Sequence, residues 1–139
     1  MSWQAYVDTN LVGTGNVSKA AICGAAGGVW ASSPNFTIQP AELQEIINGF
    51  SNKDAIQANG IHINGVKYFT LQADERSIYG KKSADGVCIV KTGQAILIGL
   101  YTEGMQAGNC TKVVEGLADY LISTGYVSYT YFAAQPQVV

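Results

Sequence analysis

Cysteine, charge and long hydrophobic runs are all scarce in this sequence of 139 residues. The three cysteines, Cys23, Cys88 and Cys110, are too few and odd in number for a disulfide framework, which favours a reducing compartment. The longest apolar runs, such as Ala95–Leu100, are far too short to span a bilayer. The N-terminus lacks the basic segment followed by an apolar one that marks a signal peptide. These absences predict a soluble, cytoplasmic protein.

Residues that catalyse reactions or bind metals are equally rare. The chain has one histidine, His62, and no Cys-x-x-Cys pair, so the sequence indicates neither a histidine-based catalytic group nor a zinc site. Charged residues make up only 13% of the chain and the formal net charge is -2, which gives no general attraction for nucleic acid. We therefore expect no enzymatic activity, no cofactor or metal ion and no nucleic-acid partner.

Hydrophobic residues account for 47% of the chain, which is enough for one domain with one hydrophobic core. An opening helix is predicted from its cap at Ser2 to Gly13, with its apolar residues on one side. Two short apolar runs at 20–23 and 29–32, separated by a glycine-rich turn, favour a β-hairpin. A second helix is predicted from about Pro40 to Gly49, because proline suits the first turn of a helix.

From residue 60 the hydrophobic period changes to two, which is typical of strands. Asn64-Gly65 is the strongest short hairpin signal available. Five strands joined by tight turns are predicted at 61–63, 66–71, 77–81, 87–91 and 95–101. A last amphipathic helix is predicted from about Ala107 to Ser123. The fold class is therefore α+β: an antiparallel sheet with the N- and C-terminal helices on one face and the short helix on the other side.

Aromatic residues gather towards the two ends of the chain. Trp3 and Tyr6 lie one turn apart on the opening helix, and Tyr120 and Tyr126 lie at the end of the closing one. Trp30 stands on an early strand. Large rings with a polar tip suit stacking on proline rings while they donate hydrogen bonds to peptide carbonyls. On the residue pattern alone, packing of the terminal helices on the sheet is the favoured explanation.

Five of the eight basic residues lie between position 76 and the end of the last predicted helix: Arg76, Lys81, Lys82, Lys91 and Lys112. This distribution fits a solvated sheet face. It equally fits a docking patch for an acidic partner or a lipid headgroup. The residues alone leave both interpretations open.

Four local sequences resemble the short profilins of fungi and amoebae. They are Met1–Asp8 (MSWQAYVD), Val29–Ser32 (VWAS), Arg76–Gly80 (RSIYG), and Leu117–Ile122 (LADYLI) followed by Gly125-Tyr126. The predicted order of helices and strands is also the profilin order. The resemblance covers residues 1–126, which implies a profilin domain over that range and a C-terminal extension of unknown role at 127–139.

The resemblance implies two binding faces. The polyproline groove of profilins lies between the terminal helices, and the matching positions here are Trp3, Tyr6, Trp30, Tyr120, Leu121 and Tyr126. The actin face is built from the later strands and the start of the last helix, with matching positions Gln72, Arg76, Lys81, Lys91, Gln106, Gly108, Thr111, Lys112 and Glu115. Phosphoinositide binding overlaps the actin face, which here implies Arg76, Lys81, Lys82 and Lys112.

A profilin of this kind would bind monomeric actin, suppress its spontaneous nucleation and deliver it to proline-rich assembly factors such as formins. The resemblance thus implies a location in the cytoplasm and cytoskeleton, with phosphatidylinositol bisphosphate as a further ligand. Gln72 stands where the short profilins often have arginine, so we expect lipid binding to be weak.

Two alternatives stay open at this point. One is a small-ligand sensing domain, which predicts an internal apolar cavity. The other is a profilin-fold small-ligand or peptide-binding module that has lost one of the two faces.

The extension at 127–139 leads to a separate hypothesis. Val127, Tyr129 and Tyr131 alternate with polar residues, which suits an extended segment laid on a surface. Tethering gives such a segment an effective concentration on the order of millimolar, enough for a very weak motif to shield the proline groove part of the time. A tail that extends the groove, packs elsewhere or has no role remains the alternative.

Overall fold

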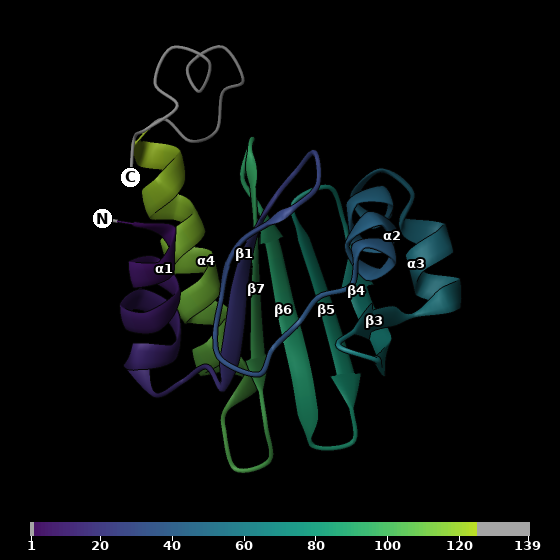
Figure 1. Ribbon diagram of the computed structural model, residues 1–139. Coiled ribbons are helices and arrows are strands. Elements are labelled where there is room, and N and C mark those ends of the chain that lie inside the picture. The colour runs from purple at the N-terminus through teal and green to yellow at the C-terminus, as the bar shows by residue number, and fades with distance from the viewer. Residues whose placement is uncertain (1, 125–139) are drawn as a thin grey trace.

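The computed structural model of the protein describes residues 2–124, in which a seven-stranded antiparallel sheet carries helices on both faces (Figure 1). The strand order is β2-β1-β7-β6-β5-β4-β3. The strands are β1 (Lys19–Gly24), β2 (Val29–Ser32), β3 (Ile61–Ile63), β4 (Val66–Ala73), β5 (Ser77–Lys82), β6 (Asp85–Lys91) and β7 (Ala95–Tyr101). The helices are α1 (Trp3–Ala5), the π-helix η1 (Tyr6–Leu11), the 3-10 turn η2 (Val12–Thr14), α2 (Pro40–Ser51), α3 (Lys53–Asn59) and α4 (Ala107–Ser123).

The predicted α+β class and the placement of both terminal helices on one face are confirmed. Figure 1 shows α1 and α4 side by side on one side of the sheet and α2 with α3 on the other. The predicted hairpin and the predicted five-strand meander form one sheet, because β1 pairs with β7 from Lys19↔Leu100 to Gly24↔Ala95.

Strand β7 lies near the centre of the sheet and is buried on both faces. Leu97 packs in the core beneath η1 and α4, whereas Ile96 and Ile98 pack in the core beneath α2 and α3. This alternation follows from the two-residue period of a strand. The strand therefore joins two hydrophobic cores, one on each side of the sheet.

The opening helix begins as predicted but is not a regular α-helix. The Ser2 hydroxyl accepts a hydrogen bond from the Ala5 N–H (3.0 Å), which caps α1. The chain then widens into η1, at whose end the Val12 N–H donates to the Val7 carbonyl five residues back. A Cβ at Gly13 would lie 2.7 Å from the Asp8 carbonyl oxygen, so this close approach requires glycine.

Helix α3 is absent from the sequence-based prediction. Its only buried residue is Ile56, so it has no hydrophobic stripe that the sequence would reveal. The Asn52 side chain caps it by accepting from the Ala55 N–H (3.3 Å). The helix packs tightly on α2, where a Cβ at Gly49 would lie 2.6 Å from Ile56.

Two hairpin turns differ in how well the sequence predicted them. The Asn64-Gly65 turn is confirmed, with positive φ at both residues (54° and 79°). Between β5 and β6 the predicted strands 77–81 and 87–91 are too short, because the turn contains only Ser83 and Ala84. Ser83 takes a φ of 53°, which closes a two-residue turn and brings Lys82 opposite Asp85.

The carboxylate of Glu42 joins the second helix to the β3–β4 turn. It accepts hydrogen bonds from the N–H groups of Asn64 (2.9 Å) and Gly65 (2.8 Å). It also accepts from the Gln39 N–H (3.0 Å) at the start of α2. One side chain therefore caps a helix and fixes the position of a hairpin.

Two glycine substitutions should change stability in opposite directions. A Cβ at Gly99 of β7 would lie 2.6 Å from Val114 of α4, so Gly99→Ala should lower the free energy of unfolding by about 1–3 kcal/mol through overpacking. A Cβ at Gly116 of α4 would meet no atom within 4 Å, so Gly116→Ala should raise it by up to about 1 kcal/mol. Urea unfolding measures both, and equal effects of the two variants would contradict the packing of α4 on β7.

Candidate ligand-binding faces

Four aromatic side chains from three separate segments form a row at the terminal helices. The ring centroid of Trp3 lies 4.8 Å from that of Trp30 and 5.9 Å from that of Tyr6. The Tyr6 centroid lies 6.3 Å from that of Tyr120. These separations are in the range of aromatic contacts. The structure therefore brings together four of the six residues expected at the polyproline groove, and we call these four the aromatic row.

Contacts between α1 and the first hairpin hold the aromatic row together. The Gln4 side chain donates to the Ser32 carbonyl (2.9 Å), which joins α1 to β2. A Cβ at Gly24 would lie 3.0 Å from the Trp30 indole nitrogen, so glycine on β1 leaves room for the indole ring. Trp30 is thereby placed next to Trp3.

The members of the aromatic row differ in exposure. Tyr120 is 52% exposed, Trp3 and Trp30 are half-buried, and Tyr6 is buried. Leu121, the fifth expected residue, is fully buried, so any part it plays is to support the surface from below. Tyr126, the sixth, lies outside the described residues.

A hollow of about 450 Å³ runs beside the aromatic row, between the opening helical segment and α4. Two stripes of residues line it: Tyr6, Asn10 and Thr14 on one side, and Lys112, Val113, Gly116, Leu117 and Tyr120 on the other. Tyr6 and Tyr120 belong to both the hollow and the aromatic row. A ligand on either would contact the same two rings.

A second candidate face surrounds Arg76, at the start of β5. Its guanidinium donates to Glu115 (2.9 Å) and to Asp119 (2.8 Å), both on α4. The two carboxylates balance the charge of Arg76 and fix its position. Arg76 and Glu115, both expected at the actin face, are therefore in direct contact.

Glu115 also binds two side chains of β5. Its second carboxylate oxygen accepts hydrogen bonds from the hydroxyls of Ser77 (2.8 Å) and Tyr79. Burial, followed by this hydrogen bond to Glu115, raises the pKa of Tyr79 to about 12. Glu115 is thus the centre of a polar network that ties α4 to β5.

The turn before β5 has its own organising carboxylate. Asp74 accepts from the N–H groups of Ser77 (2.7 Å) and Arg76 (2.8 Å). These two backbone hydrogen bonds, the one from Ser77 first, hold the pKa of Asp74 below its usual value. The Asp74-Glu75 pair is therefore part of a structured turn.

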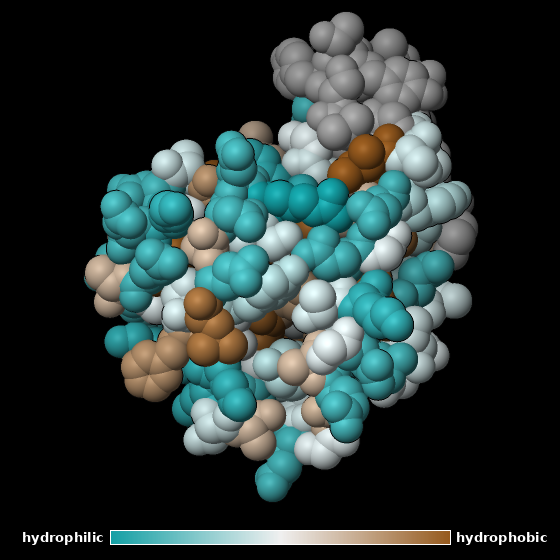
Figure 2. All heavy atoms as spheres, turned by 180° about the vertical axis from the view of Figure 1, so that it is seen from behind, coloured by the Kyte–Doolittle hydropathy of each residue, from teal (hydrophilic) through white to brown (hydrophobic). Residues whose placement is uncertain are grey.

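Two exposed apolar residues lie beside Gln72 and Lys81 of the expected actin face, and they were not predicted from the sequence. Phe69 is 69% exposed and Leu71 is 61% exposed, both on β4. Leu71 falls where the β4–β5 register shifts, and the Lys67 ammonium lies 5.8 Å from the centroid of the Phe69 ring. Figure 2 shows a small hydrophobic patch among polar atoms on the side of the molecule where β3 and β4 lie. Two large apolar residues at alternate positions of a strand were the signal that could have found this patch.

The other residues expected at the actin face are spread over several places. Gln72 and Lys81 are exposed on β4 and β5, next to the apolar pair. Gln106 and Gly108 are exposed at the start of α4, and Thr111 is half-buried one turn later. Lys91 lies apart, since its ammonium is 5.9 Å from the centroid of Phe50 in the core beneath α2 and α3.

The four residues expected to bind phosphoinositide do not form a compact group of free charges. Lys81 and Lys82 are exposed neighbours that point to opposite faces of β5. Lys112 lines the hollow beside η1, whereas Arg76 is bound by Glu115 on the β5 side of α4. Only part of the expected patch is therefore available to a single headgroup.

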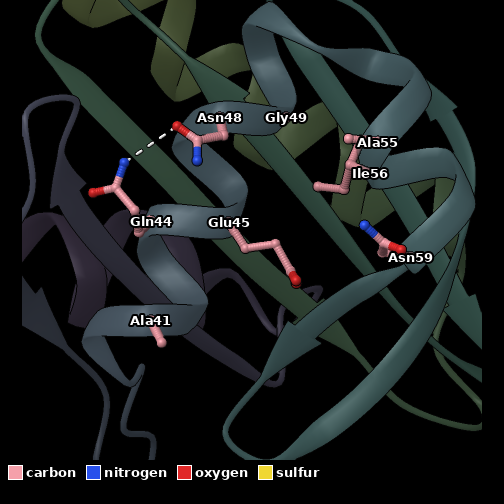
Figure 3. Close-up of a pocket in the computed structure, with 8 residues that line it drawn as sticks. All are labelled: Ala41, Gln44, Glu45, Asn48, Gly49, Ala55, Ile56 and Asn59. Atoms are coloured by element: carbon pink, nitrogen blue, oxygen red, sulfur yellow. Dashed lines mark hydrogen bonds between the residues drawn. The ribbon is translucent and has the colours of Figure 1, made fainter.

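A second hollow, of about 390 Å³, lies between α2 and α3 on the opposite face of the sheet (Figure 3). It is open to the surface, and three of its four polar side chains bind one another or a neighbour. The Gln44 amide donates to Asn48 (3.2 Å), and Glu45 contacts the ring of His62 (2.8 Å). This hollow is not the internal apolar cavity that a small-ligand sensor would require.

Within residues 2–124, no helix is long and apolar enough to cross a membrane. Across the same residues, no three His, Cys, Asp or Glu side chains are grouped so that they could hold a metal ion.

The fold and the two faces define a class of protein: a small α+β ligand-binding domain built on one antiparallel sheet. The family model described as Profilin matches residues 1–126, so the chain belongs to the profilin family. Profilin-1B of Acanthamoeba castellanii is 56% identical over 126 residues, which are 91% of this chain and 100% of that protein. The profilin of Saccharomyces cerevisiae is 53% identical over 127 residues, with the same coverage.

Solved profilin structures match the whole fold. Acanthamoeba castellanii profilin IB superposes with a TM-score of 0.87 at 56% identity, over 89% of this chain and 99% of that chain. Schizosaccharomyces pombe profilin gives a TM-score of 0.88 at 44% identity, over 90% and 100%. Mouse profilin IIa, in complex with a double repeat from the FH1 domain of mDia1, shares the fold with a TM-score of 0.75 at 24% identity, over 90% and 99%.

Family membership also gives the function at the level that the family shares. The protein is an actin-binding regulator of actin polymerisation.

The raised pKa of Tyr79 predicts a loss of stability at high pH. The ordinary pKa of tyrosine is 10.0 and that of folded Tyr79 is about 12, so the unfolded state loses this proton first as the pH rises. The free energy of unfolding should therefore fall between pH 10 and about 12, and it should fall less in Tyr79→Phe. Urea unfolding across this range measures it. Identical pH profiles of the two proteins would contradict the burial of Tyr79 against Glu115.

Proposed function

We propose that the protein holds an actin monomer at the face around Phe69, Arg76 and Glu115 while the aromatic row holds a proline-rich segment. It thereby suppresses nucleation of free actin and delivers monomers to proline-rich assembly factors such as formins. The proposal gives the protein no catalytic role and a location with actin, in the cytoplasm and cytoskeleton.

The separation of the two faces is the observation that carries this proposal. Trp30 lies on β2 and Phe69 on β4, which are five strand spacings apart in the sheet order. At about 4.8 Å per spacing the two strands are roughly 24 Å apart. Ligands centred on Trp30 and on Phe69 would leave each other room at this separation, so both could bind at the same time.

The chemistry of the aromatic row supports a proline-rich ligand. Proline-rich segments adopt an extended helix that docks on aromatic-lined grooves with little loss of conformational entropy. Trp3, Trp30 and Tyr120 are partly exposed and within contact distance of one another or of Tyr6. The FH1 double repeat bound by mouse profilin IIa is a ligand of this type.

The exposed side chains of β4 and the fixed position of Arg76 support a protein ligand at the second face. Phe69 and Leu71 offer exposed apolar surface, which is typical of the centre of an interface. Glu115 and Asp119 already fix the guanidinium of Arg76, so binding would lose little further side-chain entropy there.

We expect phosphoinositide binding to be weak and salt-dependent. Each basic residue near an anionic surface contributes about 1 kcal/mol, and salt screens that contribution. Of the four expected residues, Lys81, Lys82 and Lys112 are exposed, whereas the charge of Arg76 is balanced by two carboxylates. Gln72, beside them, is neutral. The expected site at Arg76, Lys81, Lys82 and Lys112 is therefore weaker than its sequence suggests.

Removing one ring from the aromatic row should weaken proline binding. Trp3→Ala should cost roughly 2 kcal/mol or more of oligoproline binding, which is about 30-fold in Kd, with actin binding unchanged. Since Trp3 also packs against the core, Tyr120→Ala serves as a second variant at a more exposed ring. Fluorescence titration with an oligoproline peptide measures both variants. Unaltered affinity in both would remove the aromatic row from the proline site.

Substitutions at Phe69 of β4 and Lys112 of α4 should weaken actin binding and leave proline binding intact. Phe69→Ser should raise the Kd for monomeric actin roughly 30-fold, as loss of an apolar hot spot does. Lys112→Glu should weaken it by several kcal/mol if that charge meets an acidic actin surface.

Inhibition of actin polymerisation measures both variants. Val29→Ser is the matched control, because Val29 is an exposed apolar residue on β2 (42%), outside the proposed actin face. Wild-type inhibition by both Phe69→Ser and Lys112→Glu would overturn the proposed face.

A further inference from the structure

Gly116 is one of the residues that line the hollow between η1 and α4. A Cβ at Gly116 would meet no atom within 4 Å, so no packing contact within residues 2–124 requires glycine there. Glycine in the interior of a helix costs about 1 kcal/mol relative to alanine. What the glycine preserves is open space above Val113 and Leu117.

The lining of this hollow favours an uncharged, partly aromatic ligand. Val113 and Leu117 are apolar, and the rings of Tyr6 and Tyr120 border them. The Asn10 amide can donate or accept hydrogen bonds, and the exposed Lys112 can keep its charge in water. The volume of about 450 Å³ is that of an ordinary ligand pocket.

The chain itself carries a segment of this chemistry. Residues 127–139 (VSYTYFAAQPQVV) contain no charged side chain and three aromatic ones, at Tyr129, Tyr131 and Phe132. Residues 1–126 cover 100% of Profilin-1B of Acanthamoeba castellanii, so the segment has no counterpart there. Residues 127–139 are therefore an addition to the profilin domain that the two proteins share.

The attachment point puts this segment within reach of the hollow. Helix α4 ends at Ser123, three residues after Tyr120 at the rim. From Ser123 back to Lys112 the helix covers about 17 Å, whereas thirteen extended residues span up to about 43 Å. The segment is long enough to return along the whole hollow.

We propose that residues 127–139 bind in the hollow between η1 and α4 and compete there with proline-rich ligands for Tyr6 and Tyr120. The competition part rests on the proposed function, because it requires the aromatic row to be the proline site. Tethering supplies an effective concentration on the order of millimolar, so a segment with millimolar affinity occupies the hollow part of the time. The extension then reduces the fraction of protein that is free to bind a proline-rich partner.

Comparing the full chain with residues 1–126 tests the binding directly. The shorter form retains the complete range matched by the profilin family, so it is expected to fold. In NMR spectra, deletion of 127–139 should shift the Gly116 amide and the Val113 methyl groups but not those of Ile63, on the far edge strand β3. A synthetic 127–139 peptide added to residues 1–126 should reverse these shifts. Unchanged Gly116 and Val113 signals would overturn the proposal, and leave the hollow to another occupant.

Filling the hollow gives a matched control. In a Gly116→Leu background, deletion of 127–139 should no longer shift the Val113 signals. Gly108 is also in α4, and a Cβ there also meets nothing within 4 Å, but Gly108 does not line the hollow. In a Gly108→Leu background the deletion should therefore still shift the Val113 signals. Shifts that survive Gly116→Leu would place the segment elsewhere and overturn the proposal.

Oligoproline affinity tests the competition. Residues 1–126 should bind the peptide about two- to fivefold more tightly than the full chain, as expected for partial occupancy by a tethered competitor. The difference should vanish in the Gly116→Leu background. Equal or weaker binding by the shorter form would overturn the competition. If neither form binds oligoproline, the proposed proline site fails, while the NMR comparison still decides whether the segment occupies the hollow.

Discussion

The pairing of β1 with β7 is the contact on which the rest of the structure depends. It joins the first hairpin to the later strands, so one sheet separates two hydrophobic cores. It also sets Trp30 on β2 beside Trp3 on α1, because β2 pairs with β1. Without this pairing the terminal helices would lack part of their supporting sheet. The aromatic row would lose the residue that joins it to the strands.

Helix α4 connects the two candidate faces in a single rigid element. Glu115 faces β5 and binds Arg76, Ser77 and Tyr79, whereas Tyr120 faces η1 and joins the aromatic row. Between them, Val114 presses on β7 at Gly99 and fixes the height of the helix above the sheet. The geometry of both faces therefore depends on the position of α4 relative to the sheet.

Local signals in the sequence were enough for the fold class but not for the long-range contacts. The Asn64-Gly65 turn and the Ser2 cap depend on neighbouring residues, and both form as predicted. The β1–β7 pairing depends on residues some 75 positions apart, and a strand pattern does not name its partner strand. For the same reason, the sequence placed Arg76 in a group of cations but did not show that Glu115, thirty-nine positions later, binds it. The sequence shows that aromatic residues lie near both ends of the chain, but only the packing of the terminal helices determines which of their rings stay exposed.

The two edges of the sheet bear on how the protein behaves at high concentration. Edge strands expose unpaired backbone groups that can pair with another molecule and start aggregation. Here the outer strands β2 and β3 have only four and three residues, and β4 is itself an edge beyond Tyr68, where β3 no longer pairs with it. Pro34 follows β2 closely, and proline has no N–H to donate to a neighbouring strand. The long strands β6 and β7 lie in the interior of the sheet, paired on both sides. The short outer strands therefore offer little backbone for pairing with a second molecule, and the interior strands β6 and β7 offer none.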